Sequence, residues 1–308
     1  MRNITFTSHG VACAAWHVPA VTDTLQAPAG RPCIVMAHGL GGTRDTGLLR
    51  FAEAFAAAGV DAFVFDYRGF GGSDGSPRQN ISVRRQRQDY RAAVATARHL
   101  PGVDPDRIAL WGTSYSGGHV VAVAADDPRV AAVVSMNPAT DGAAALVQLT
   151  RYAGVGQLVR ATGHGLLDAT RALTRRTPHH VPVVGPPGSA ALISTPGSEQ
   201  AYLSIAGPSW RNETCARTAL GVAVNRPTVH ARRISCPLLV QVGRDDRIAP
   251  PAAARRTAGK AGRHAELREY PIDHFDFYSG NWQQRVAADQ VTFLTAVLER
   301  STVVSHSV

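Results

Sequence analysis

The chain has almost no lysine, and this shortage affects how its basic charge is interpreted. Lys260 is the only lysine among 32 basic residues, so the net charge of +9 comes almost entirely from arginine. The arginines are scattered along the 308 residues, which indicates biased composition rather than a nucleic-acid-binding surface. We therefore expect no nucleic-acid partner.

Long apolar segments are also missing. No stretch approaches the roughly 20 apolar residues that span a bilayer. The apolar run at residues 11–16 is too short for a signal peptide and is broken by His17. The sequence therefore predicts a cytoplasmic protein without a membrane partner. Apolar residues still make up 44% of the chain and charged residues 18%, which allows a sizeable core and excludes a disordered chain.

Cysteines are few and far apart. No pair has the C-x-x-C spacing of a zinc site, and no histidine cluster accompanies them. We expect buried free thiols in a reducing compartment and no bound metal. The four residues are Cys13, Cys33, Cys215 and Cys236.

Apolar runs alternate with helical patterns through the first 138 residues. The runs at residues 4–6 and 11–18 indicate an opening antiparallel pair of strands. Nearly unbroken apolar strands between helices are typical of a parallel sheet that is covered on both faces. Further strands are expected at residues 32–38, 60–66, 107–111 and 130–135, and helices at 45–58, 83–100 and 114–125.

This alternation stops at residue 139 and resumes at residue 234. The segment between is rich in glycine and proline, and only short helical pieces are expected in it, such as those at 143–149 and 212–222. Strands at 236–242 and 265–270 and helices at 251–261 and 283–300 follow it. We therefore expect an α/β core formed by residues 1–138 and 234–300, a lid inserted at 139–233, and a loose tail at 301–308.

Ser114 occupies the turn between an expected strand and an expected helix. A nucleophile on such a strained turn needs small residues two positions before and two positions after it. Gly112 and Ser116 meet this need, although the usual G-x-S-x-G pattern has glycine at the second position. The following helix directs the positive end of its dipole at the turn, which favours a developing oxyanion. Ser114 is the predicted nucleophile.

A nucleophilic serine needs a base, and the base needs an orienting carboxylate. Asp246 follows the expected strand at 236–242, and His274 follows the strand at 265–270. Both lie at the carboxyl ends of parallel strands, as Ser114 does. The positions of these three residues therefore predict a catalytic triad.

Two other aspartates follow strands as well. Asp141 comes after the strand at 130–135 and is the alternative acid. Asp245 precedes the preferred Asp246, and we expect it to cap the following turn.

These motifs resemble those of the α/β-hydrolase superfamily over nearly the whole chain. Residues 38–42 (His-Gly-Leu-Gly-Gly) are similar to its HG-type oxyanion loop, and residues 66–73 (Asp-Tyr-Arg-Gly-Phe-Gly-Gly-Ser) to its D-x-R-G-x-G-x-S segment. Residues 243–250 match the usual acid loop, which favours Asp246 over its neighbour. Residues 273–275 (Asp-His-Phe) resemble its GHF-like ending, with aspartate in place of glycine.

Within the superfamily the chain resembles the dienelactone-hydrolase-type group, which includes polyketide acyltransferases. Its elbow also resembles that of cocaine-esterase-type enzymes, whose large extra β domain it lacks. The resemblance implies an α/β-hydrolase fold, with a mostly parallel doubly wound sheet and an inserted lid, and a serine hydrolase that needs no cofactor or metal. It also implies an oxyanion hole formed by the backbone N–H groups of Leu40 and Tyr115.

The substrate class is inferred from the expected lid, which is rich in apolar residues and poor in acids. We expect a small-molecule substrate with a bulky apolar acyl group, such as a polyketide-like ester or thioester. One alternative is an acyltransferase that passes the acyl group to an alcohol or amine. Another is a non-catalytic ligand-binding protein on the same fold.

Several further residues are tempting candidates. We expect His38 and His119 to be structural, and His179 and His180 to be surface residues of the lid. Two aromatic residues of the expected lid either line the pocket or only bury the lid against the core; these are Tyr202 and Trp210.

Overall fold

The computed structural model describes residues 1–304 and has an eight-stranded sheet at its centre. The first two strands pair antiparallel and the second also lies antiparallel to its other neighbour, whereas all remaining neighbours are parallel. The mostly parallel sheet that the sequence predicts is therefore confirmed. Its order is β1 (Arg2–Ser8), β2 (Val11–Val18), β4 (Asp61–Phe65), β3 (Arg31–Ala37), β5 (Val103–Thr113), β6 (Val130–Met136), β9 (Leu238–Gly243) and β10 (Ala265–Tyr270).

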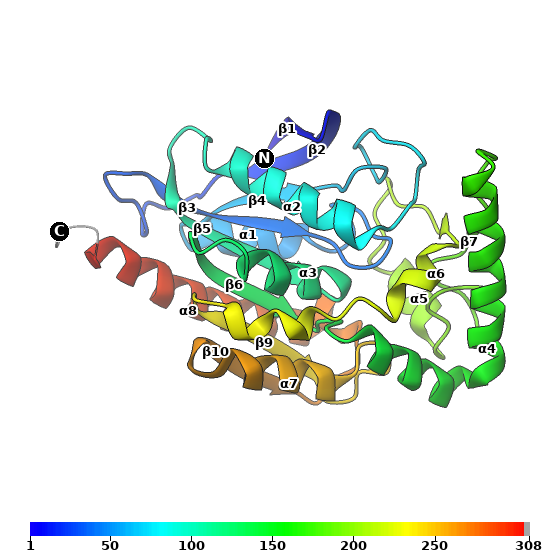
Figure 1. Cartoon of the computed structure of the whole chain (residues 1–308). Coiled ribbons are helices and arrows are strands. Elements are labelled where there is room, and N and C mark those ends of the chain that lie inside the picture. The colour runs from blue at the N-terminus through cyan, green and yellow to red at the C-terminus, as the bar shows by residue number, and fades with distance from the viewer. Residues whose placement is uncertain (305–308) are drawn as a thin grey trace.

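Helices cover both faces of this sheet (Figure 1). In β4 the side chains alternate between two cores, because successive residues of a strand point to opposite faces. Phe63 and Phe65 belong to one buried cluster, and Ala62 and Val64 to the other. The first cluster is closed by α2 (Val83–Ala97), α3 (Tyr115–Ala124) and α7 (Pro251–Ala261), and the second by α1 (Leu49–Ala57) and α8 (Gly280–Val304).

The C-terminal helix is longer than the sequence predicts. It continues through Val304, four residues beyond the expected end at Arg300. The loose tail expected from Ser301 is therefore wrong for residues 301–304, and residues 305–308 lie outside the described part of the chain. Within residues 1–304, no helix combines the length and apolarity needed to cross a membrane. All four cysteines are buried free thiols.

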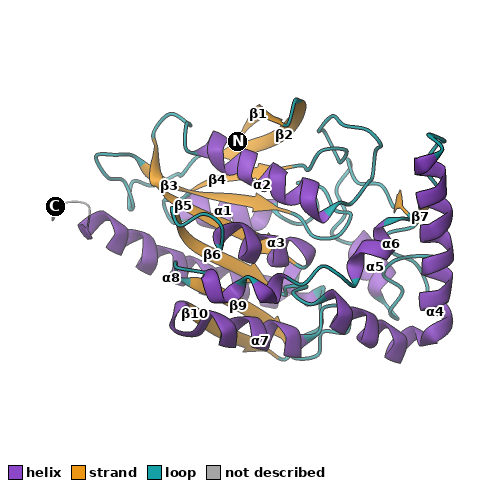
Figure 2. Ribbon diagram, viewed as in Figure 1, coloured by secondary structure: helices purple, strands orange, loops and turns teal. Residues whose placement is uncertain are grey.

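Most of the segment at 139–233 lies beyond the carboxyl ends of the central strands, on the right of Figure 1, whereas its last residues, 227–233, run back along the sheet and pack against α3 and α7. The short helical piece expected at 143–149 is instead the start of a 32-residue helix, α4 (Gly142–Leu173), which kinks at Gly154, where φ is 75°. Glycines within this helix hid it from sequence analysis, since each costs about 1 kcal/mol of helix propensity relative to alanine. The rest of the segment holds α5 (Ser198–Leu203), α6 (Thr218–Val222), the two-residue strands β7 (His180–Val181) and β8 (Thr214–Cys215), the 3₁₀ helices Pro227–Val229 and Ala231–Arg233, and loops (Figure 2).

Candidate active site

Ser114 lies on the sharp turn between β5 and α3. Its φ of 53° and ψ of −116° are unfavourable for a residue with a side chain and mark a strained elbow. A Cβ atom at Gly112 would lie 2.3 Å from the carbonyl oxygen of Ser116, so only glycine fits there. A Cβ atom at Gly39, in the loop that faces the elbow, would lie 2.9 Å from the Ser114 Cβ. The elbow and this loop therefore approach each other through their glycines.

Ser116 replaces the second glycine of the usual pattern, and its hydroxyl is fully buried. It donates a 2.7 Å hydrogen bond to the Ala37 carbonyl and accepts one of 2.8 Å from the Thr113 backbone N–H. These bonds tie the elbow to the end of β3. The substitution of serine for glycine thus adds a brace beneath the turn.

Ser114, His274 and Asp246 form one hydrogen-bonded chain. The Oγ atom of Ser114 lies 3.0 Å from Nε2 of His274, and Nδ1 of His274 lies 2.6 Å from Oδ2 of Asp246. The other carboxylate oxygen of Asp246 accepts bonds of 2.8 and 2.7 Å from the backbone N–H groups of Ile248 and Ala249. All three side chains are at least nine-tenths buried. With its hydrogen on Nδ1, the imidazole presents the free electron pair of Nε2 to the serine hydroxyl.

The two other candidate aspartates lie apart from this chain. Asp141 caps α4 by accepting a bond from the Ala144 N–H, and it pairs with Arg226 at 3.3 Å. Asp245 is exposed, and the turn that it was expected to cap is capped by Asp246 instead. The geometry therefore brings Asp246, and neither alternative, to the imidazole.

Asn137 is a residue of the site that sequence analysis missed. Its Oδ1 atom accepts hydrogen bonds from the Ser114 N–H at 3.2 Å and from the Thr113 hydroxyl at 2.8 Å. Its Nδ2 donates a 2.9 Å bond to the His274 carbonyl. Asn137 thus joins the elbow to the histidine loop. The available signal was its place directly after β6, because neighbouring parallel strands end at one edge of the sheet.

Two aromatic residues of the 139–233 segment hold the loop at residues 38–42. The Tyr202 hydroxyl donates a 3.0 Å hydrogen bond to the Leu40 carbonyl, and the Trp210 indole donates one of 3.0 Å to the Gly41 carbonyl. Their rings stack with centroids 5.0 Å apart. These residues therefore position the expected oxyanion loop, a role that sequence analysis did not consider.

The other candidate histidines lie outside the triad. Burial lowers the pKa of His38 to about 4, and its Nδ1 bonds to the Gly39 carbonyl. Burial also lowers the pKa of His119 well below the usual value, and its Nε2 contacts Gln86. His179 and His180 are partly exposed, and Nε2 of His179 lies 2.8 Å from Nδ1 of His164.

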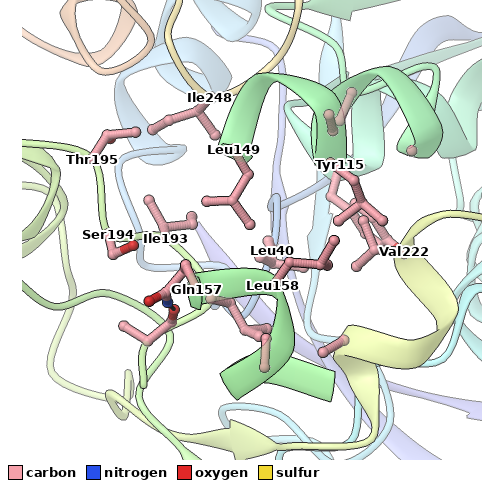
Figure 3. A pocket seen from close by; sticks show the side chains of 18 of the residues that line it. Leu40, Tyr115, Leu149, Gln157, Leu158, Ile193, Ser194, Thr195, Val222 and Ile248 are labelled. Atoms are coloured by element: carbon pink, nitrogen blue, oxygen red, sulfur yellow. Dashed lines mark hydrogen bonds between the residues drawn. The ribbon is translucent and has the colours of Figure 1, made fainter. Parts of the chain in front are cut away.

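Ser114 opens into a pocket of about 1080 Å³, which is continuous with solvent. Leu40 and Tyr115, whose backbone N–H groups are the predicted oxyanion donors, line it too. Figure 3 shows its side chains. The lining is mostly apolar, and Arg247, which also lines the pocket, forms an ion pair with Asp273. The apolar lining includes Leu146, Leu149, Leu158, Ile193, Val222 and Ile248.

A second, smaller pocket of about 360 Å³, a volume that includes space open to solvent, also reaches Ser114. The two pockets share Leu40, Ser114 and Ile193, and His274 lines only the smaller one. Ser114 thus lies where a large apolar pocket and a small pocket meet.

Comparison with known proteins identifies the family. The sequence profile of the α/β-hydrolase family described as serine aminopeptidase, S33 matches residues 28–272. The chain belongs to this family. The predicted α/β-hydrolase fold is confirmed, and so is the prediction of an α/β-hydrolase enzyme of the class that acts on ester bonds.

Relatives lie in bacteria and fungi. The chain is 37% identical to the quorum-quenching protein AidA of Acinetobacter baumannii (strain MDR-ZJ06), over 96% of this chain and 95% of that protein. It is 39% identical to the thiohydrolase aneE of Aspergillus aculeatus, over 36% of this chain and 35% of that protein. The polyketide transferase GrgF of a Penicillium species is 36% identical over 36% of this chain and 37% of that protein.

The fold also matches a solved structure. The crystal structure of the α/β hydrolase GrgF superimposes with a TM-score of 0.79, covering 96% of this chain and 98% of that one at 24% identity. At that identity the superposition shows the fold alone. The name of GrgF agrees with the resemblance to polyketide acyltransferases that the sequence motifs indicate.

Proposed function

We propose that the protein cleaves esters or thioesters of a bulky apolar acyl group, by forming an acyl-enzyme on Ser114. The observation that carries this proposal is the hydrogen-bonded chain from Asp246 through His274 to Ser114, ending at the mouth of a large apolar pocket. A buried serine with an aligned imidazole is the arrangement needed for nucleophilic acyl transfer.

The first half of the reaction transfers the acyl group to the enzyme. Ser114 Oγ attacks the substrate carbonyl carbon while its proton passes to Nε2 of His274. Asp246 holds the imidazole through Nδ1 and offsets the positive charge that the ring gains. The carbon–leaving-group bond then breaks, and the leaving group takes the proton from Nε2. Water, activated by the same nitrogen, releases the acid in the second half.

The oxyanion of the tetrahedral intermediate is expected between the backbone N–H groups of Leu40 and Tyr115. Tyr115 is the first residue of α3, where the N–H groups of a helix have no carbonyl partner inside the helix. Losing one such donor typically costs about 3–4 kcal/mol of transition-state stabilisation.

The large pocket supports an apolar acyl group. Most of its walls come from the 139–233 segment, and the elbow, the loop at Leu40 and residues 247–248 complete them, so in this proposal the segment acts as a lid over Ser114. Each buried methylene of a substrate contributes about 0.8 kcal/mol until the pocket is full. The relatives named thiohydrolase and polyketide transferase are consistent with acyl release or acyl transfer.

A series of acyl esters and thioesters with one constant leaving group tests this proposal. Below the micelle concentration, kcat/KM should rise from acetyl towards octanoyl. The Leu149→Trp variant fills part of the pocket and should shift the optimum to shorter chains, while Ser114→Ala gives the background rate. A preference for acetyl in the wild type would contradict the proposed acyl pocket. Binding of the esters without any Ser114-dependent product would favour the non-catalytic alternative.

A further inference from the structure

Asp273, the residue directly before His274, uses both oxygens of its carboxylate to bind its surroundings. The GHF-like ending that this segment resembles has glycine here, so the carboxylate adds contacts that the usual residue could not make. Its Oδ1 accepts hydrogen bonds from the backbone N–H groups of Arg247 at 3.0 Å and of His274 at 2.7 Å. Its Oδ2 lies 2.6 Å from Nε and 2.5 Å from Nη2 of the Arg247 guanidinium.

These bonds join the two loops that carry the acid and the base of the predicted triad. Arg247 directly follows Asp246 in the acid loop at residues 243–250, and Asp273 lies in the histidine loop at residues 271–275. The strands β9 and β10 pair in parallel up to their carboxyl ends, where each chain turns into its loop. Beyond the strands, the Asp273 carboxylate connects the two loops beside the 2.6 Å bond between His274 and Asp246.

The backbone of His274 is held on both sides. Its N–H donates to Asp273, and its carbonyl accepts a 2.9 Å bond from Nδ2 of Asn137. In the acid loop, the N–H of Arg247 donates to Asp273, whereas the next two N–H groups along the chain donate to Asp246 itself. Each partner of the imidazole–carboxylate contact is therefore held through its neighbour in the sequence.

We propose that Asp273 is a positioning residue, which together with Arg247 sets the distance and direction between Nδ1 of His274 and the Asp246 carboxylate. This inference rests on the proposed function of Ser114. Asp273 acts through His274 and takes no part in proton transfer. A displacement of about 1 Å can lower the rate of an enzyme about a hundredfold, so a contact that sets this geometry has a large effect on the rate.

The exposure of the ion pair argues against a role in stability alone. The side chains of Arg247 and Asp273 are 40% and 27% exposed. Water screens a pair that is this accessible, so the pair contributes little to the free energy of unfolding. Burial raises the pKa of Asp273, but the bonds from Arg247 and His274 outweigh burial and lower the pKa overall. The carboxylate and its four contacts are therefore retained at neutral pH.

Glu269 offers a matched control. Its carboxylate lies 2.6 Å from Nε of Arg255, and the side chains of Arg255 and Glu269 are 44% and 34% exposed, similar to the pair at Asp273. This ion pair joins β10 to α7 and leaves the acid loop untouched. Glu269→Gln therefore removes an ion pair of similar exposure without changing a contact of the triad.

The expected effect falls on kcat. Asp273→Ala should lower kcat for the octanoyl ester about tenfold or more, while KM changes less than about threefold. Asp273→Asn keeps an oxygen for the two N–H groups and should retain more of kcat. In the double variant with Arg247→Met, kcat should be no lower than in Asp273→Ala alone, because the two side chains act as one unit. Glu269→Gln should keep the wild-type kcat.

The NMR signal of the proton on Nδ1 of His274 reports the contact directly, because that proton lies in a short bond to a carboxylate. This signal should move upfield or broaden in Asp273→Ala and stay unchanged in Glu269→Gln. Asp273→Asn gives the same readings, with smaller changes, if the alanine variant does not fold.

Two results would overturn the proposal. One is an unchanged kcat with an unchanged Nδ1 signal in the Asp273 variants, even if the melting temperature falls. The other is a rise in KM without a loss of kcat, which would assign the pair to the shape of the pocket. Failure of the proposed function looks different, because the wild type itself would then show no Ser114-dependent hydrolysis.

Discussion

The hydroxyl of Tyr202 donates a 3.0 Å hydrogen bond to the backbone carbonyl of Leu40, across 162 residues of sequence. Leu40 belongs to the loop that is expected to bind the oxyanion, and Trp210 bonds to the next carbonyl of the same loop. The 139–233 segment therefore does more than form one wall of the large pocket. It also holds the backbone of the loop that carries the Leu40 N–H group, on which the proposed chemistry depends.

Replacing Tyr202 with phenylalanine should lower kcat more than it changes KM. The variant keeps the ring that stacks on Trp210 and removes only the bond to Leu40. A net hydrogen bond is worth about 0.5–1.5 kcal/mol, which corresponds to a two- to twelve-fold loss of rate. Steady-state kinetics measures this loss of rate. The Tyr152→Phe variant serves as the control, because Tyr152 is 48% exposed. A lower melting temperature with unchanged kcat would assign the bond to stability alone.

Asp246→Asn should reduce kcat by about four orders of magnitude. The asparagine amide would no longer hold the hydrogen on Nδ1 of His274, so Nε2 would present the wrong tautomer to Ser114. Asp245→Asn and Asp141→Asn serve as controls and should stay within a few-fold of wild type. If Asp141→Asn were the severe change and Asp246→Asn mild, the carboxylate would have been assigned to the wrong strand.

The rate should rise with pH as one histidine becomes neutral. His274 must lack a proton on Nε2 to accept one from Ser114, so kcat/KM should increase as the pH rises. Burial lowers the pKa of His38 to about 4, so His38 is already neutral near neutral pH and contributes no step there. His38→Gln should therefore keep the rising limb. Loss of the rising limb in the His38→Gln variant would contradict the role of His274. A flat pH profile, measured where the chemical step limits the rate, would contradict it too.

The sequence was sufficient for the core and for the predicted triad. Strands such as β4 are apolar on both faces, which marks them as buried strands of a parallel sheet. Ser114 and Asp246 each follow such a strand, and His274 follows β10, the partly exposed parallel strand at the edge of the same sheet. Because parallel strands end at one edge of the sheet, their places in the chain already predict that they meet there.

The 139–233 segment was harder to predict, for two physical reasons. Gly154 and the other glycines of α4 lower its helix propensity, and packing against the rest of the segment, including the α6 contact at Gly165, outweighs this loss. The contacts of Asn137 and Tyr202 join residues far apart in the chain. No local pattern records such a contact, so only the folded structure reveals that these two side chains support the site.

The most direct test of the central claim is the mass of the peptide containing Ser114 after treatment with a fluorophosphonate. The wild type should carry one label on Ser114, Ser114→Ala should carry none, and all variants should keep the same circular dichroism spectrum. Ser116→Gly restores the usual elbow pattern and should still be labelled, since the Ser116 hydroxyl is committed to Ala37. Labelling that persists in Ser114→Ala, or that disappears only in Ser116→Gly, would contradict the assignment of Ser114 as the nucleophile.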